Sequence, residues 1–280
     1  MNYAKTSYIL IWGLIMMVTN VARAQDAPEL TVWIRAGGPG VKNEISSFVQ
    51  NVIEALPSTT TSKILICTNI NDTILEELDI ITKTNKSVEV IFSKLNSFST
   101  ALTDLAKHTD ARSNVLTLSV GVNIREDQIQ TGLKTLTGSV KVYGWQITEH
   151  GNDGSCPGKG WYNTAALIDK TIVQQMRKTV PVWVDNNYLP KEGNYTIGGN
   201  EEVPIMVYAL QKEPTAKFIL NTSDPVSSNL QLGTQITFEE KLARKVFVGN
   251  IYMKKLHKEL NVETDFDSWL RKIWSSLEVI

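Results

Sequence analysis

From Leu30 onward, short apolar runs alternate with segments whose apolar residues recur at helical spacing. The first four runs are predicted strands, at residues 30–34, 64–67, 88–92 and 115–120. The segments between them carry one apolar face each, as amphipathic helices do. Strands that alternate with helices of this length form βαβ units. The sequence therefore predicts an α/β domain with a mainly parallel sheet and helices on both faces.

The regular alternation changes after residue 140. A strand over 140–145 and a polar, glycine-rich loop over 149–160 are predicted first. The later predicted elements are a helix over 165–173, a strand over 182–184, a helix over 201–211, a short strand over 217–220, a helix from Thr237 to about Leu260, and a last helix over 266–277.

The N-terminus reads as a targeting segment. Residues 6–22 carry no charge, and Ala22-Arg23-Ala24 fits the small-x-small pattern that signal peptidase cuts. The uncharged run is shorter than the roughly 20 residues that span a bilayer comfortably. We predict a cleaved signal peptide over 1–24, with an uncleaved signal anchor as the alternative. The mature chain would divide into a domain over 25–236 and C-terminal helices over 237–280 packed on it, in the secretory lumen or outside the cell, with no later membrane span.

Composition limits the partners. Lys and Arg number 28 and Asp and Glu 29, and no long run of one sign occurs, so no nucleic-acid partner is predicted. The two cysteines, Cys67 and Cys156, are too few for a disulfide scaffold. A bridge between them is allowed, but a buried free thiol is the favoured interpretation for Cys67. Sequons that suggest a glycoprotein stand at Asn71, Asn85, Asn194 and Asn221.

Several standard sites are absent at the level of motif. The chain has no G-x-S-x-G, no Walker A loop, no H-E-x-x-H and no paired C-x-x-C. The glycine-rich stretch at 37–40 follows the first strand, where a dinucleotide loop would lie. It lacks the G-x-G-x-x-G spacing, and Pro39 removes a backbone donor, so a plain turn is predicted.

From Leu30 to about Asn229, the order of elements resembles a nucleotide-sugar glycosyltransferase of the family 2 type. That family has the Rossmann-like GT-A fold, which implies a mixed, mainly parallel sheet in strand order 3-2-1-4 at its start. After its second strand the family carries a polar segment, often D-G-S-x-D-x-T, that holds the nucleotide base. Residues 67–73 stand there, and the resemblance implies nucleotide-binding roles for Thr68, Asn69, Asn71 and Asp72.

The resemblance also implies catalytic and acceptor-side residues. In the family a later helix begins with an acidic pair, whose second member is the general base of inverting enzymes. Glu201 and Glu202 stand at that place, although acids at a helix start also suit the helix dipole. Residues 160–166 resemble the stretch on the acceptor side, which implies that Trp161 and Asn163 lie near the acceptor.

The metal motif departs from the family. Where an Asp-x-Asp should follow the fourth strand, the chain reads Ser119-Val120-Gly121, with no carboxylate to hold a cation beside a diphosphate. Glu126 and Asp127 come a few residues later and could substitute only if the strand ended later. Their alternative role is the first turn of a helix. The sequence predicts a nucleotide sugar as the donor and no tightly bound divalent metal.

Three functions fit this sequence. The first is a lumenal enzyme that transfers a sugar from a nucleotide sugar. The second is a catalytically inactive relative that binds a glycan or a protein through the same cleft, which the missing carboxylates favour. The third is an unrelated secreted α/β protein. Binding of UDP or GDP, with and without manganese, discriminates among them.

Overall fold

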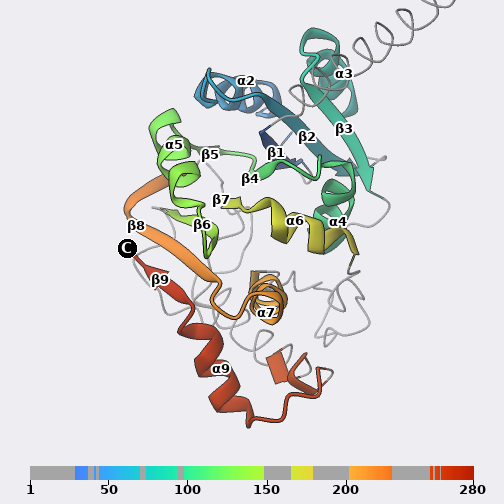
Figure 1. Cartoon of the computed structure of the whole chain (residues 1–280). Coiled ribbons are helices and arrows are strands. Elements are labelled where there is room, and N and C mark those ends of the chain that lie inside the picture. Colours follow the sequence, from blue (N-terminus) through green and yellow to red (C-terminus); the bar gives the residue numbers. More distant parts are fainter. Residues whose placement is uncertain are drawn as a thin grey trace, which may run out of the picture.

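The structure is a computed structural model that describes residues 29–36, 41, 44–69, 74–93, 98–147, 165–178, 202–228, 253–254, 256–258 and 260–280 (Figure 1). Its elements in chain order are β1 (Leu30–Arg35), α2 (Ile45–Ala55), β2 (Ser62–Asn69), α3 (Leu75–Thr84), β3 (Val88–Ser93), α4 (Phe98–His108), β4 (Asn114–Ser119), β5 (Val122–Asn123), α5 (Glu126–Thr135), β6 (Val140–Ile147), β7 (Ala165–Ile168), α6 (Lys170–Lys178), α7 (Glu202–Lys212), β8 (Lys217–Ser228), α9 (Phe266–Trp274) and β9 (Leu277–Val279).

The described strands form one mixed sheet in the order β3-β2-β1-β4-β7-β6-β8-β5, with β9 paired to β8. The first four strands run parallel, with β1 between β2 and β4 and with β3 beyond β2. The predicted 3-2-1-4 order is therefore confirmed. β7 lies antiparallel between β4 and β6, whereas β6 and β8 are parallel. The sheet is mixed and mainly parallel, as predicted.

The central strand is buried on both faces. Leu30, Val32, Trp33 and Ile34 of β1 have no exposed surface. A parallel strand covered by helices on both sides needs apolar residues at consecutive positions, which explains its apolar run, interrupted at Thr31. This burial is also why the central strand could be predicted from sequence.

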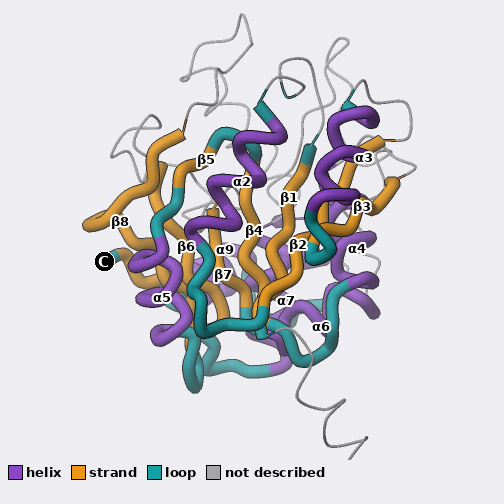
Figure 2. Tube along the Cα trace, turned by 90° about the horizontal axis from the view of Figure 1, so that it is seen from above, coloured by secondary structure: helices purple, strands orange, loops and turns teal. Residues whose placement is uncertain are grey.

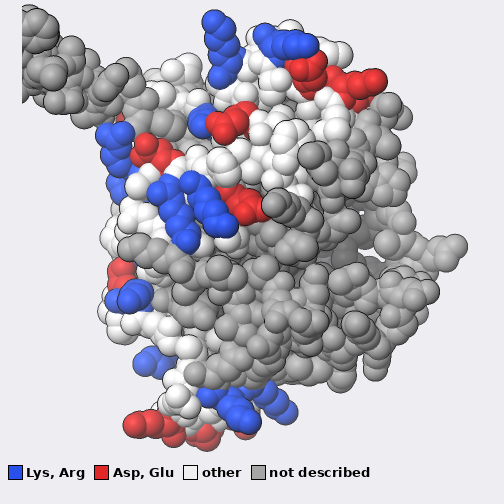
Figure 3. All heavy atoms as spheres, turned by 90° about the vertical axis from the view of Figure 1, so that its right-hand side faces the viewer, with Lys and Arg blue, Asp and Glu red and all other residues white. Residues whose placement is uncertain are grey.

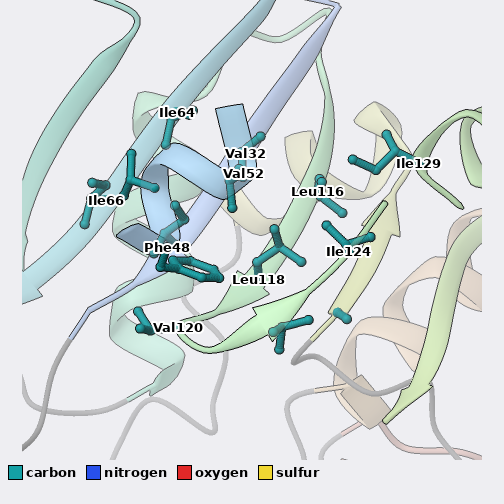
Figure 4. Packing of buried hydrophobic residues seen from close by; sticks show 14 of the residues in the cluster. Val32, Phe48, Val52, Ile64, Ile66, Leu116, Leu118, Val120, Ile124 and Ile129 are labelled. Atoms are coloured by element: carbon teal, nitrogen blue, oxygen red, sulfur yellow. The ribbon is translucent and has the colours of Figure 1, made fainter. Parts of the chain in front are cut away.

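Helices α2, α3 and α5 cover one face of the sheet. Figure 4 shows Phe48 and Val52 of α2 beside Val32 of β1, with Ile64 and Ile66 of β2 in the same cluster. The helix presents this row because its apolar residues recur every three or four positions. Burying each such side chain stabilises the fold by about 1.5–3 kcal/mol relative to leaving it exposed.

The opposite face is covered by α4, α6, α7 and α9, whose apolar residues share a second core cluster with the strands (Figures 1 and 2). Trp33 and Leu65 supply the sheet side of this cluster, and Leu105, Met206 and Ile273 come from three of the helices. The two clusters make a three-layer arrangement of helix, sheet and helix. Within the described residues, no helix is both long enough and apolar enough to cross a bilayer.

The predicted helix over 165–173 is wrong in its first half. Ala165–Ile168 form β7, and α6 begins only at Lys170. All four β7 residues are buried between β4 and β6. A short apolar run of this kind fits a buried strand as well as a helix, and pairing with both neighbours decides the outcome.

The last predicted helix ends earlier than expected. α9 stops at Trp274, and Leu277–Val279 form β9 parallel to β8. The backbone of Ile280 continues this pairing, because its N–H donates to the Leu220 carbonyl at 3.0 Å. β8 itself extends from Lys217 to Ser228, well beyond the short strand predicted. The predicted loop over 149–160 and strand over 182–184 lie outside the described residues, as does most of the helix predicted from Thr237.

Candidate functional site

Three side chains meet in one row at the carboxyl end of the parallel strands. Arg35 of β1 pairs in register with Cys67 of β2 on one side and with Ser119 of β4 on the other. The Nη2 of Arg35 donates a hydrogen bond to Oγ of Ser119 at 2.8 Å, across a sequence separation of 84 residues. In open α/β sheets, ligands bind beyond this end of the strands, so the row marks the floor of the candidate site.

The row projects toward the face covered by α4, α6 and α7. Side chains alternate along a strand, so Arg35 points to the same side as Trp33. Trp33 packs in the cluster that α4, α6 and α7 build. Its indole Nε1 donates to Oγ1 of Thr109, just after α4, at 2.8 Å, and both residues are buried. Arg35 thus ends the strand face that also carries the buried residues Thr31 and Trp33.

The structure accounts for each residue at the expected metal position. The Ser119 hydroxyl accepts from Arg35, and Val120 is only 4% exposed, inside the α2 side of the core. Gly121 has φ of 91°, a left-handed conformation that glycine adopts without strain and that turns the chain out of β4. A Mg²⁺ or Mn²⁺ ion prefers carboxylate oxygens. One hydroxyl beside a guanidinium does not fit such an ion.

Glu126 and Asp127 do not replace the missing carboxylates. They form the first turn of α5, which packs on the opposite face of the sheet from Arg35. Asp127 accepts from Nε of Arg125 at 3.0 Å, and hydrogen bonding from that guanidinium holds the pKa of Asp127 below its usual value. Across the described ranges, no group of three His, Cys, Asp or Glu side chains is arranged to hold a metal ion.

The polar segment after β2 is described only in part. Thr68 is buried at 4% exposure, and the backbone of Asn69 pairs in register with Ser93 of β3. The other two residues with predicted nucleotide contacts, Asn71 and Asp72, lie outside the described residues. The nucleotide-binding role of all four stays a prediction.

Cys67 is a buried free thiol beside Arg35. The pKa of Cys67 is raised to about 12, chiefly by burial and also by the charge of Asp104, while the charge of Arg35 acts to lower it. The thiol is therefore neutral near pH 7 and is no candidate nucleophile, because the thiolate is the reactive form. The neutral thiol places no negative charge beside Arg35.

The predicted base lies on the side of the sheet that Arg35 faces. Glu202 is the first residue of α7, and this helix packs through Ile205, Met206 and Ala209 into the cluster that also holds Trp33. A helix start at this place agrees with the predicted element, and the catalytic role stays a prediction. Glu201, Trp161 and Asn163 lie outside the described residues.

Arg35 is the candidate that sequence reasoning missed. The run from Leu30 to Ile34 was predicted as a strand, and the glycines after it as a turn, so the arginine between them received no role. The available signal is a single charge that ends an apolar strand at the edge where ligands bind. No local pattern, however, indicates its partner on β4.

Surface charge elsewhere is mixed. Figure 3 shows Lys and Arg beside Asp and Glu over the described part of the face that it presents. Surface ion pairs of this kind include Lys83 with Asp79 on α3 and Lys107 with the half-buried Asp104 on α4. Such pairs contribute little to stability, about 0–1 kcal/mol each.

Solved structures with similar folds were found by comparison. A mannosyltransferase from Pyrobaculum calidifontis, solved in complex with GDP-Man and Mn²⁺, superposes with a TM-score of 0.58 at 10% sequence identity, covering 89% of this chain and 74% of its own. The chain has the GT-A fold. The fold implied by the resemblance is thereby confirmed, and its similarity to a nucleotide-sugar glycosyltransferase is one of structure.

A second similar structure is the glucosyl-3-phosphoglycerate synthase of Mycobacterium tuberculosis, solved with Mg²⁺ and UDP. It has a TM-score of 0.47 and 12% identity, covering 82% of this chain and 80% of its own. No family model matches the sequence, and no curated protein matches it. The mannosyltransferase shares the GT-A fold although only 10% of the sequence is identical.

Proposed function

We propose that this GT-A domain binds a nucleotide sugar at the carboxyl end of β1, β2 and β4 and transfers the sugar to an acceptor hydroxyl. The observation that carries the proposal is the row of Arg35 and Ser119 at this edge, in a fold similar to that of a mannosyltransferase solved with its nucleotide sugar. An arginine at this edge suits the negative charge of a nucleoside diphosphate.

Glu202 would act as the general base of the transfer. In an inverting reaction its carboxylate takes the proton of the acceptor hydroxyl while that oxygen attacks the anomeric carbon of the donor. The bond from this carbon to the diphosphate oxygen breaks, and the nucleoside diphosphate leaves with the bonding electrons. Glu202 begins α7, on the side of the sheet that Arg35 faces, and this location supports the assignment.

A catalytically inactive relative that binds a glycan or a protein is the second candidate. It is favoured by the degenerate motif, in which Ser119 is bonded to Arg35 and Val120 is packed in the core. Neither residue resembles the pair of carboxylates that the family uses there. Such a protein would bind its ligand without transferring a sugar.

An assay of nucleotide release separates the two candidates. The purified protein is incubated with UDP- and GDP-sugars and a panel of glycan acceptors, and the freed UDP or GDP is measured. Transfer predicts acceptor-dependent release in the wild type. It also predicts loss of release in Glu202→Gln at unchanged thermal stability, because an amide cannot accept the proton. Glycan binding without any release would overturn the enzymatic proposal in favour of the inactive relative.

We also propose that the chain enters the secretory pathway. The support is the uncharged stretch over 6–22 and the Ala22-Arg23-Ala24 pattern. N-terminal sequencing of the protein expressed in a eukaryotic cell checks this. A start at Gln25 is expected, a retained start in a membrane fraction indicates the signal anchor, and a cytosolic chain that begins at Met1 refutes both.

A further inference from the structure

The Arg35–Ser119 pair lies at the position where the resemblance implies a metal ion and a diphosphate. Arg35 ends β1, and Ser119 ends β4, the strand after which the Asp-x-Asp motif is expected. Their hydrogen bond of 2.8 Å joins the two strand ends at one level of the sheet. The guanidinium of Arg35 therefore places a fixed positive charge beside the position where the family motif would bind a metal ion.

We propose that Arg35 contacts the diphosphate of the nucleotide ligand directly and takes the place of the divalent ion. The inference rests on the proposed function and specifies how the same site neutralises its ligand. It makes nucleotide binding independent of metal and dependent on one guanidinium. Ser119 acts as a positioning residue, because its hydroxyl orients the guanidinium without touching the ligand.

The chemistry of arginine suits this role. The guanidinium stays charged at all physiological pH values, and its planar fork of N–H donors matches two oxygens of a phosphate. Arg35 is half-buried, so its charge interacts with a ligand through less water than a surface charge would. The neighbouring Cys67 thiol is neutral and does not offset this charge.

The same arrangement disfavours a divalent cation. Such an ion at the end of β4 would lie close to the guanidinium of Arg35 and be repelled by it. The oxygens near it would be the Ser119 hydroxyl, which already accepts from Arg35, and backbone carbonyls. Mg²⁺ and Mn²⁺ exchange their bound water for carboxylate oxygens far more readily than for a hydroxyl and backbone carbonyls.

Calorimetry on the mature protein tests the proposal with UDP, GDP and inorganic pyrophosphate, and with uridine and guanosine as ligands that lack the diphosphate. Each titration is run in EDTA and again in Mn²⁺. The variants are Arg35→Gln, which removes the charge, and Arg35→Lys, which keeps it without the fork. Ser119→Ala releases the guanidinium. Arg125→Gln is the matched control, because Arg125 is an ion-paired arginine on the opposite face of the sheet.

The proposal predicts that UDP or GDP binds the wild type equally in EDTA and in Mn²⁺. Arg35→Gln should weaken diphosphate binding by about tenfold to a hundredfold, the loss expected for a hydrogen bond to a charged group. Arg35→Lys should fall between it and the wild type. Ser119→Ala should weaken binding by less than Arg35→Gln does. Any binding of uridine or guanosine should be the same in all variants, which would separate loss of the contact from loss of the fold.

Other outcomes overturn specific claims. If Mn²⁺ raises the affinity at least tenfold, or if Arg35→Gln binds as Arg125→Gln does, the role of Arg35 is refuted while nucleotide binding stands. If pyrophosphate binds through Arg35 but no nucleotide binds, the role of Arg35 stands and the proposed function fails. If the wild type binds none of these ligands, both fail.

Discussion

The indole Nε1 of Trp33 donates a hydrogen bond to Oγ1 of Thr109 at 2.8 Å, and both side chains are buried. The bond joins the central strand to the end of α4. Trp33 lies two residues before Arg35, on the same face of the strand. Thr109 also donates to the Leu105 carbonyl at 2.8 Å, so its hydroxyl is held in place by the helix that it caps. This contact sets α4 against the sheet beside the candidate site.

Thr109→Ala should destabilise the protein by about 1–3 kcal/mol, because the buried indole N–H loses its acceptor. Chemical denaturation followed by circular dichroism measures the change. The matched control is Thr135→Ala, in which a half-buried threonine loses a similar but solvent-exposed bond to the Thr131 carbonyl. That control should change stability by less than about 0.5 kcal/mol. Equal effects in the two variants would show that the Trp33 bond contributes nothing.

Gly132→Ala should destabilise the protein although alanine favours helices. A Cβ at this position of α5 would lie 2.5 Å from Cδ1 of Leu167 and 3.2 Å from the Trp145 ring. Both neighbours are completely buried, so the Leu167 side chain would have to shift within the core. The gain in helix propensity is about 1 kcal/mol, and overpacking of a core costs about 1–3 kcal/mol.

Thermal denaturation of Gly132→Ala should therefore show a lower Tm than the wild type. Thr131→Ala is the control, since Thr131 is the exposed neighbour on the same helix, and its Tm should change little. A Gly132→Ala variant that is more stable than the wild type would mean that α5 does not approach β7 this closely.

The stability contributed by Asp110 should depend on pH. Its pKa is lowered chiefly because the backbone N–H of Arg112 donates to Oδ1 at 2.8 Å, with the Arg112 side chain adding to the effect. A lowered folded pKa means that the contribution is complete above the unfolded value, near 3.9, and is lost as the pH falls through the folded value.

The measurement is the Tm of the wild type and of Asp110→Ala between pH 3 and pH 7. The wild type should be the more stable at pH 7, and the difference should shrink below about pH 4. Asp110→Asn, which keeps an oxygen acceptor but does not titrate, should lose less at pH 7 than Asp110→Ala does. A difference that stays constant over the whole range contradicts the assignment.

Cys67 should resist alkylation in the folded protein. Its pKa of about 12 leaves roughly one thiol in ten thousand ionised at pH 8, and its side chain is only 3% exposed. In a Cys156→Ser variant, iodoacetamide should add no mass to the native chain during the time that fully modifies the denatured chain. Rapid modification of the native protein would contradict both the burial and the raised pKa.

Sequence could predict β1 to β4, whose apolar runs alternate with amphipathic helices in chain order. β1 to β4 read as apolar runs because helices cover both faces, and each helix between them shows its own apolar stripe. β7 was not predicted because the short apolar run Ala165–Ile168 has no periodicity that distinguishes a strand from a helix. β9 was not predicted because its three residues form a strand only by pairing with β8.

Part of the candidate site could be predicted from the sequence and part could not. The absence of carboxylates at 119–121 could be read directly from the sequence. The partnership of Arg35 with Ser119 could not, because it depends on the register of two strands that are far apart in the chain. Sequence periodicity predicts which residues face the core, whereas it says little about which two strand ends will lie side by side.

A crystal structure grown with UDP or GDP in the presence of Mn²⁺ tests the central claim most directly. We expect the diphosphate at the carboxyl ends of β1 and β4, with its oxygens within hydrogen-bonding distance of the Arg35 guanidinium and no ion bridging it to the protein. A diphosphate held through Mn²⁺ on protein carboxylates, or a nucleotide bound away from this edge, would contradict the account.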